Sequence, residues 1–191
     1  MTWVVYKEGK WGLKFDLVVI VLVQLAGIGW GAYALHQNRP YFMVFTVDRF
    51  EVLSQRDVDF STIRNPEFMD KPFSGPVLLY ANMPKAGPDF QKLLSEIVFE
   101  GKADLAFRPE FWSVYAERLQ AVLDVSRPLL ELRDARPQSV SGIDKVVRNN
   151  GADITALNYV PATLPNGEFA AILDAHSGEL IDTLVIDPWV N

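Results

Sequence analysis

The feature that most constrains the fold of this chain is an uncharged run of 19 residues, Leu17–Leu35. As an α-helix this run would rise about 28 Å, at roughly 1.5 Å per residue, which matches a bilayer core of about 30 Å. It is too long for the core of a signal peptide, and it lacks a small-residue cleavage pattern. A buried helix of a soluble protein would need a larger protein around it. The sequence therefore predicts a transmembrane helix over residues 17–35.

The flanks of this run predict its orientation. Lys7, Lys10 and Lys14 precede it, whereas only Arg39 follows closely. Lysine and arginine accumulate in cytoplasmic loops, so residues 1–16 are expected to form a basic cytoplasmic segment. Residues 40–191 are then expected to form one domain on the other side of the membrane, since about 150 residues suffice for a single core.

Three residues inside the run are candidate contacts with another membrane helix. Gly27 and Gly31 form a G-x-x-x-G pattern, which lets a second helix approach closely. Gln24 lies near the middle of the run, where an amide favours an interhelical hydrogen bond because lipid offers no partner. The alternative is that these are ordinary glycines of a membrane helix and a glutamine that bonds within its own helix.

The domain is expected to begin and end with strands. Tyr41–Leu53 is predicted as one long strand, bent near Asp48–Arg49 where the alternation slips, and Pro76–Ala81 as a short strand. The C-terminal part contains three further predicted strands, with a glycine-containing hairpin loop between the last two. Pro161 places the first of these at a sheet edge. These strands cover residues 156–164, 169–174 and 180–187.

Apolar residues at helical spacing predict three helices between the two groups of strands. The first follows Asp89 and ends near Gly101, the second runs from Pro109 to the residues before Arg127, and the third follows Ser139. The order of strands, helices and strands predicts an α+β domain with an antiparallel sheet packed on helices. The aromatic residues of the second helix are expected to lie mostly in the core.

Composition excludes several kinds of chemistry. The chain contains no cysteine, which rules out a disulfide scaffold, a thiol nucleophile and a zinc–thiolate site. A net charge of −6 argues against nucleic-acid binding. His176 lies beside Asp174 and Ser177, but neighbours in one turn do not form a triad, so we expect an exposed loop histidine. Because no phosphate-binding, dinucleotide-binding or hydrolase motif is present, we expect no enzyme, metal site or cofactor.

Several stretches together resemble one known family. They are KEGKWGLKFDL at Lys7–Leu17, the run with its central Gln24, the pair Arg39–Pro40, and VDRFEV at Val47–Val52. The combination resembles the TfpX/TfpZ family of type IV pilin accessory proteins. The resemblance covers residues 1–53 well, and the remainder in outline only, by a strand led by Gly75–Pro76, a helix and a C-terminal hairpin.

The resemblance implies a bacterial inner-membrane protein with a periplasmic domain. It would be a chaperone-like accessory protein that influences assembly and surface display of a type IV pilin, with pilin and the lipid bilayer as its partners. Members usually carry two further transmembrane helices upstream, so Met1 is expected to be an internal methionine of a longer protein. A membrane-anchored sensor or ligand-binding protein is the alternative. The positions that match the family are Lys14, Asp16, Arg39, Pro40, Asp48, Arg49 and Phe50.

Overall fold

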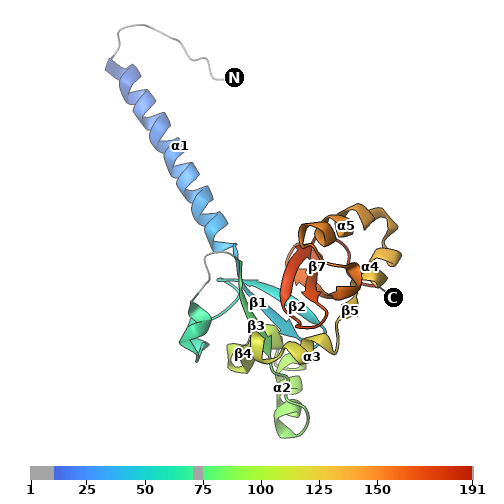
Figure 1. The fold of residues 1–191 in the computed structure, drawn as a ribbon. Helices are drawn as coiled ribbons and strands as arrows, with labels where there is room; N and C mark the ends of the chain where they lie inside the picture. Colours follow the sequence, from blue (N-terminus) through green and yellow to red (C-terminus); the bar gives the residue numbers. More distant parts are fainter. Residues whose placement is uncertain (1–10, 71–74, 191) are drawn as a thin grey trace. The chain divides into compact units, whose positions relative to one another are not determined.

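The computed structural model describes residues 11–70 and 75–190. The chain divides into two units, Met1–Arg39 and Pro40–Asn191. The described part of the first unit contains one long helix, α1 (Trp11–Gln37), whose apolar part, Lys14–Gln37, is long and apolar enough to cross a membrane (Figure 1). The predicted span over residues 17–35 lies inside it. Residues 1–10 of the predicted cytoplasmic segment lie outside the described residues.

The second unit is an α+β domain, as predicted. Its eight-stranded sheet has the order β4-β3-β1-β2-β6-β7-β8, and β5 also pairs with β6. The sheet is mixed rather than purely antiparallel, because β1 pairs with β3 and β2 pairs with β6 in parallel. The strands are β1 (Pro40–Thr46), β2 (Arg49–Ser54), β3 (Val77–Ala81), β4 (Trp112–Val114), β5 (Arg127–Pro128), β6 (Leu157–Leu164), β7 (Gly167–Asp174) and β8 (Leu180–Leu184).

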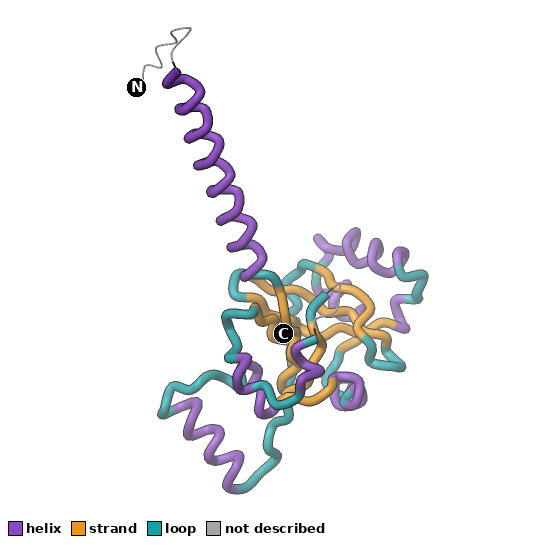
Figure 2. Tube along the Cα trace, turned by 90° about the vertical axis from the view of Figure 1, so that its left-hand side faces the viewer, coloured by secondary structure: helices purple, strands orange, loops and turns teal. Residues whose placement is uncertain are grey.

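Helices and short 3-10 turns surround this sheet (Figure 2). The helices are α2 (Pro88–Val98), α3 (Leu119–Leu123), α4 (Leu129–Ala135) and α5 (Val140–Asn149). The first and third helices predicted from the sequence are confirmed as α2 and α5. Helix α4 was not predicted, because its seven residues are too short for a clear helical period.

The predicted long strand over residues 41–53 is instead a hairpin of β1 and β2. Thr46 pairs with Arg49, and Val47–Asp48 forms the turn between them. The apolar run that suggested one strand is continuous because both faces of β1 are buried. Phe42 and Val44 belong to one core cluster, and Met43 and Phe45 to another.

The predicted second helix is wrong, because residues 109–123 form a 3-10 turn, strand β4, another 3-10 turn and α3. In a helix, Trp112 and Tyr115 would lie on one face. In the structure they enter different core clusters, and β4 pairs with β3 through Trp112–Val114. Strand pairing and burial on two sides therefore override the helical spacing. Phe107 and Phe111, which are partly buried, pack against the same cluster as Trp112, so these aromatic residues belong to the core.

Strand β6 is central rather than at an edge. Pro161 is tolerated there because β5 pairs with Asn158 and Tyr159, while β2 pairs with Ala162 and Thr163. Pro161 therefore lies in the gap between two partner strands, where its missing N–H costs no ladder hydrogen bond on that side.

Three core clusters follow from this arrangement. One lies on the face of the sheet covered by α3 and includes Phe50 and Tyr115. The other two lie on the opposite face: one joins β1 and β3 to Leu93 of α2, and one joins β6 and β7 to α4 and α5. Figure 1 shows α4 and α5 beside β7, and α2 at the other end of the sheet.

Candidate functional site

The candidate helix contacts lie on one face of α1. Gln24, Gly27 and Gly31 are separated by three and four residues, which places them on the same side of a helix. A Cβ atom added at Gly27 or Gly31 would meet nothing within 4 Å in the described chain. This face can therefore accept the backbone of a second helix at short distance.

The positions that match the family at the ends of α1 are exposed. Lys14 and Asp16 lie near the start of the described helix, and Arg39 follows its end. Pro40 is the first residue of β1 and pairs with Ser54 across the hairpin. None of these four residues is buried in its own unit.

The three positions in the hairpin have different environments. Asp48 lies in the exposed turn and accepts a hydrogen bond from Arg49 Nε at 2.9 Å. The Arg49 guanidinium lies over the ring of Trp189, 5.1 Å from its centroid. Phe50 is fully buried and packs against Phe45. Phe50 is therefore a core residue, whereas Asp48 and Arg49 belong to the surface.

Two further arginines bind the same stretch as Arg49, the 187–190 segment (Asp187–Val190). Arg127 Nη1 donates to the carbonyl of Val190 at 2.7 Å. Arg136 Nη2 donates to the carbonyl of Trp189 at 2.6 Å and to Asp187 Oδ2 at 2.7 Å. Three arginines from different parts of the chain thus hold a segment that has no strand pairing of its own.

No pattern in the sequence indicates these arginine contacts. They join residues 51 to 140 positions apart, and an isolated arginine carries no information about a distant carbonyl. In the sequence, Arg127 marks only the end of the predicted second helix.

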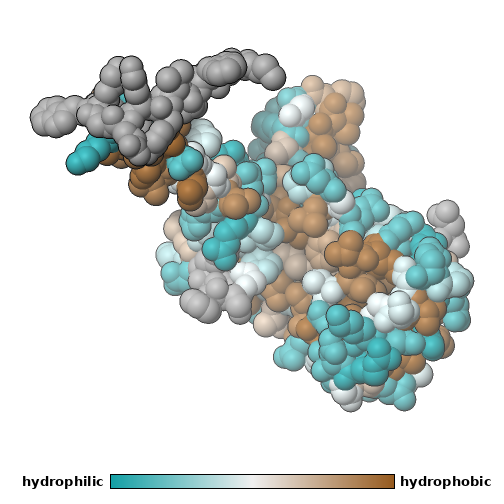
Figure 3. Space-filling view, turned by 90° about the horizontal axis from the view of Figure 1, so that it is seen from above, coloured by the Kyte–Doolittle hydropathy of each residue, from teal (hydrophilic) through white to brown (hydrophobic). Residues whose placement is uncertain are grey.

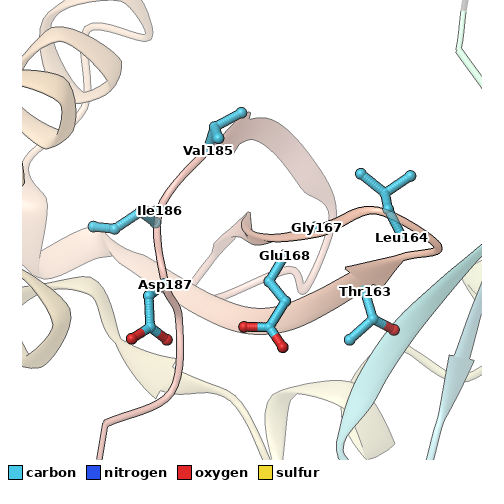
Figure 4. Close-up of a pocket in the computed structure, with 7 residues that line it drawn as sticks. All are labelled: Thr163, Leu164, Gly167, Glu168, Val185, Ile186 and Asp187. Carbon is cyan, nitrogen blue, oxygen red and sulfur yellow. The ribbon is translucent and has the colours of Figure 1, made fainter.

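A cavity of about 540 Å³ lies between the β6–β7 hairpin and the chain after β8 (Figure 4). Two carboxylates, Glu168 and Asp187, line it and point to the same side in this view. Asp187 is already paired with Arg136. Val185 lines the rim and is 91% exposed. Elsewhere on the domain, apolar patches alternate with hydrophilic ones (Figure 3).

The Asp174 side chain in the β7–β8 loop forms hydrogen bonds with the backbone of the same loop. Asp174 Oδ1 accepts hydrogen bonds from the backbone N–H groups of His176 and Ser177, at 2.9 and 2.7 Å. These bonds lower the pKa of the Asp174 carboxyl. His176 is exposed. Within residues 11–70 and 75–190, no group of three or more histidine and carboxylate side chains is placed to hold a metal ion.

A charged cluster joins α2 to the loop after it. Glu96 is 7% exposed. Its carboxylate accepts a hydrogen bond from Arg108 at 2.8 Å and forms an ion pair with Lys102 at 3.1 Å. Arg108 also pairs with Glu110. The hydrogen bond from Arg108, followed by that from Lys102, lowers the pKa of Glu96 below its ordinary value of 4.5.

Replacement of Glu96 by glutamine is expected to weaken the acid sensitivity of the fold. A carboxyl with a lowered pKa stabilises the folded state above its unfolded pKa, and this stabilisation is lost as the pH falls through the folded value. The E96Q chain should therefore be less stable than wild type at pH 7, and its unfolding midpoint should fall less as the pH is lowered from 7, through the ordinary value of 4.5, to below the folded pKa of Glu96. Urea unfolding of the chain in detergent micelles measures this.

The control for this prediction is E100Q, because the side chain of Glu100 is 54% exposed and its ion pair among the described residues is with Lys102. Exposed pairs contribute little, so E100Q should follow the wild-type curve. If E96Q and E100Q have the same pH dependence, the pairing of Glu96 does not contribute to acid unfolding.

The fold and this geometry define an α+β domain preceded by one helix apolar enough for a membrane. Comparison with known proteins adds a similarity to fimbrial assembly proteins. The chain is 30% identical over 118 residues to the fimbrial assembly protein of serogroup I from Dichelobacter nodosus, and equally to that of serogroup E1. The matched stretch is 61% of this chain and 45% of each relative.

The chain thus matches less than half the length of these curated relatives. No family model matches it. No solved structure matches it either.

Proposed function

We propose that this chain is a non-enzymatic accessory protein of type IV pilus assembly that binds its pilin. The observation that carries the proposal is its similarity to two fimbrial assembly proteins. The sequence stretches that resemble the TfpX/TfpZ family support the narrower assignment to a chaperone-like pilin accessory protein. In this proposal the chain acts on assembly and display of the pilin by binding rather than by catalysis.

The proposed location is the bacterial inner membrane, with the N-terminus in the cytoplasm and the α+β domain in the periplasm. The length and apolarity of α1 support membrane anchoring. The basic residues before the helix support the orientation, since Lys14 is followed by no further lysine or arginine until Arg39.

The proposed contact with the pilin is the face of α1 that carries Gln24, Gly27 and Gly31. Small residues let two membrane helices pack closely, and an amide in lipid gains from an interhelical hydrogen bond. A partner that itself holds a membrane helix could therefore pair with this face.

The experiment is crosslinking in native membranes, followed by affinity purification of the tagged chain and quantification of pilin by mass spectrometry. We expect G31L to lower pilin recovery by about tenfold, which corresponds to roughly 1.4 kcal/mol of lost helix contact. Because a Cβ atom added at Gly31 meets nothing within 4 Å among the described residues, the substitution should leave the helix itself intact.

Gly29 offers a matched control. It is five residues from Gln24, on the opposite side of the helix, and it too has open space around it. G29L should therefore recover as much pilin as wild type. Equal loss with G29L and G31L would contradict a contact specific to this face. If neither substitution changes pilin recovery, the contact lies in the domain instead. If pilin is absent from all samples while it is abundant in the membranes, the proposal is overturned.

A further inference from the structure

Strand β8 leaves part of its neighbour β7 without a partner. The pairing of the two strands ends where Ala170 of β7 lies opposite Leu184, the last residue of β8. Strand β7 itself begins at Gly167. Residues 167–169 therefore pair with β6 on one side, whereas no strand of the described chain lies on their other side.

This stretch of β7 is a free edge with unused hydrogen-bonding groups. Successive residues of a strand direct their N–H and C=O groups to opposite sides, so at least one of these three residues directs both groups to the open side. Apart from the ladder with β6, no backbone hydrogen bond within residues 11–70 and 75–190 involves Gly167, Glu168 or Phe169. A free edge is a template for pairing with another extended segment.

The cavity of about 540 Å³ lies at this edge (Figure 4). Gly167 and Glu168 line it from β7, and Val185–Asp187 line it from the chain that leaves β8. Ligand sites commonly have volumes of about 300–1,000 Å³, so the space is large enough for a few residues of a peptide. The cavity is an open groove, which suits a segment that lies along the edge of the sheet.

The two sides of this groove differ in character. In Figure 4, Glu168 and Asp187 point to one side, and Leu164 and Val185 point to the other. Both apolar side chains are exposed. Because successive side chains of a strand point to opposite sides, an added segment would place every second residue beside the carboxylates. The residues between them would contact the apolar side.

The carboxylate side carries negative charge that the chain does not neutralise. Asp187 is paired with Arg136, but Glu168 forms no ion pair among the described residues. No lysine or arginine lines the groove. Glu51 pairs with Thr163 and Thr163 pairs with Glu168 across neighbouring strands, so a further carboxylate lies on the same face of the sheet. This side therefore favours a cationic side chain.

The same charges disfavour a second copy of this chain as the occupant. Residues 167–187, which contain β7 and β8, include five carboxylates and no lysine or arginine. Pairing of this edge with its own copy would bring like charges together, which is destabilising. Charged side chains at sheet edges commonly prevent such self-association. The occupant is therefore a different, basic segment.

We propose that this groove binds an extended segment of a partner protein, in which a lysine or arginine lies between two apolar residues. The segment pairs as an added strand with residues 167–169 of β7. Its cationic side chain lies beside Glu168, and its apolar side chains contact Leu164 and Val185. The inference is independent of the pilin contact proposed for α1.

The test is an NMR titration of the full chain in detergent micelles, following the backbone N–H signals of Gly167, Glu168 and Val185. The probe is the blocked peptide acetyl-Ser-Val-Lys-Val-Ser-amide, added at constant ionic strength. We expect saturable shifts of these signals. Absence of a saturable shift would overturn the proposal.

Two modified peptides separate the contributions of charge and backbone. Replacement of the lysine by glutamate should weaken binding by at least about fivefold, because like charges would then face each other. N-methyl groups on the three central residues keep the positive charge but remove the backbone donors, so they should abolish binding. If either modified peptide binds as tightly as the parent peptide, the proposal is overturned.

A peptide with the sequence of β8, acetyl-Leu-Ile-Asp-Thr-Leu-amide, tests the second copy as the occupant. It should bind no more tightly than the glutamate peptide, because it is acidic and would face Glu168. If it binds more tightly than the lysine peptide, the groove is a contact between copies of this chain, and the proposed basic partner is wrong.

Charge reversal at Glu168 tests the residue assigned to the cationic side chain. Glu168 is exposed, so E168K should keep the wild-type melting temperature. E168K should weaken binding of the lysine peptide by at least about fivefold and should bind the glutamate peptide more tightly than wild type does. E168Q should give an intermediate loss.

The matched control is E179K, because Glu179 is also exposed and lies in the loop at the opposite end of β7. E179K should bind the lysine peptide as wild type does. Equal losses with E168K and E179K would mean that the peptide responds only to the overall charge of the chain, and an unchanged peptide preference in E168K would remove Glu168 from the site. Either result would overturn the proposal.

Discussion

Replacement of Phe50 by alanine is expected to lower the free energy of unfolding by about 3–5 kcal/mol. Phe50 is fully buried and pairs with Phe45 across the hairpin, with ring centroids 5.3 Å apart. The centroid of its ring also lies 5.7 Å from that of Tyr115. Truncation would therefore leave a cavity in the core cluster between the sheet and α3. Urea unfolding of the full chain in detergent micelles, followed by tryptophan fluorescence, measures the loss.

The same substitution at Phe99 is the control. Phe99 is 84% exposed, and exposed truncations change stability by less than about 0.5 kcal/mol. Phe50 is one of the positions that match the family resemblance, so the two variants distinguish a role in the core from contact with a partner. A stable F50A chain that fails to recover pilin would show that Phe50 contacts a partner, contrary to its burial.

The parts of the fold that the sequence predicted are those determined by neighbours along the chain. Helix α1 follows from one uncharged run, and α2 and α5 follow from apolar residues at helical spacing. The β7–β8 hairpin follows from its loop residues, including Gly178. In each case local periodicity and turn chemistry agree with the final packing.

The errors arose where packing on both sides of the sheet overrides local spacing. The apolar run at residues 41–53 fits one strand, but its middle forms the Val47–Asp48 turn because β1 and β2 are both buried and pair with each other. Val47 adopts a φ of 50°, a conformation that a β-branched residue rarely takes. No sequence rule places valine in such a turn, so the hairpin was not predicted.

The candidate site likewise has one part that local sequence predicts and one part that only the packing determines. The face with Gln24, Gly27 and Gly31 could be predicted, because spacing alone defines it. The arginine contacts to the 187–190 segment could not be predicted, since they depend on where that segment returns in three dimensions.

Substitution of Gly178 is the second change for which we expect a large loss of stability. Its φ is 77°, and a Cβ atom there would lie 3.1 Å from the Leu119 carbonyl oxygen and 3.1 Å from Leu123 Cγ. Its own carbonyl accepts the hydrogen bond from the Tyr115 hydroxyl. The glycine thus joins the β7–β8 loop to α3, so that the position is restricted both by its backbone conformation and by close neighbours.

G178A is therefore expected to lower the free energy of unfolding by about 2–4 kcal/mol, from a left-handed backbone penalty of about 1–2 kcal/mol and from crowding. G151A separates the two contributions, because Gly151 has a φ of 58° but open space around its Cβ position. It should lose only the backbone part, about 1–2 kcal/mol. Urea unfolding of both variants measures the difference. Equal losses would mean that the loop moves away from α3 without cost, and the contact between Gly178 and Leu119 would then contribute nothing to the stability of the domain.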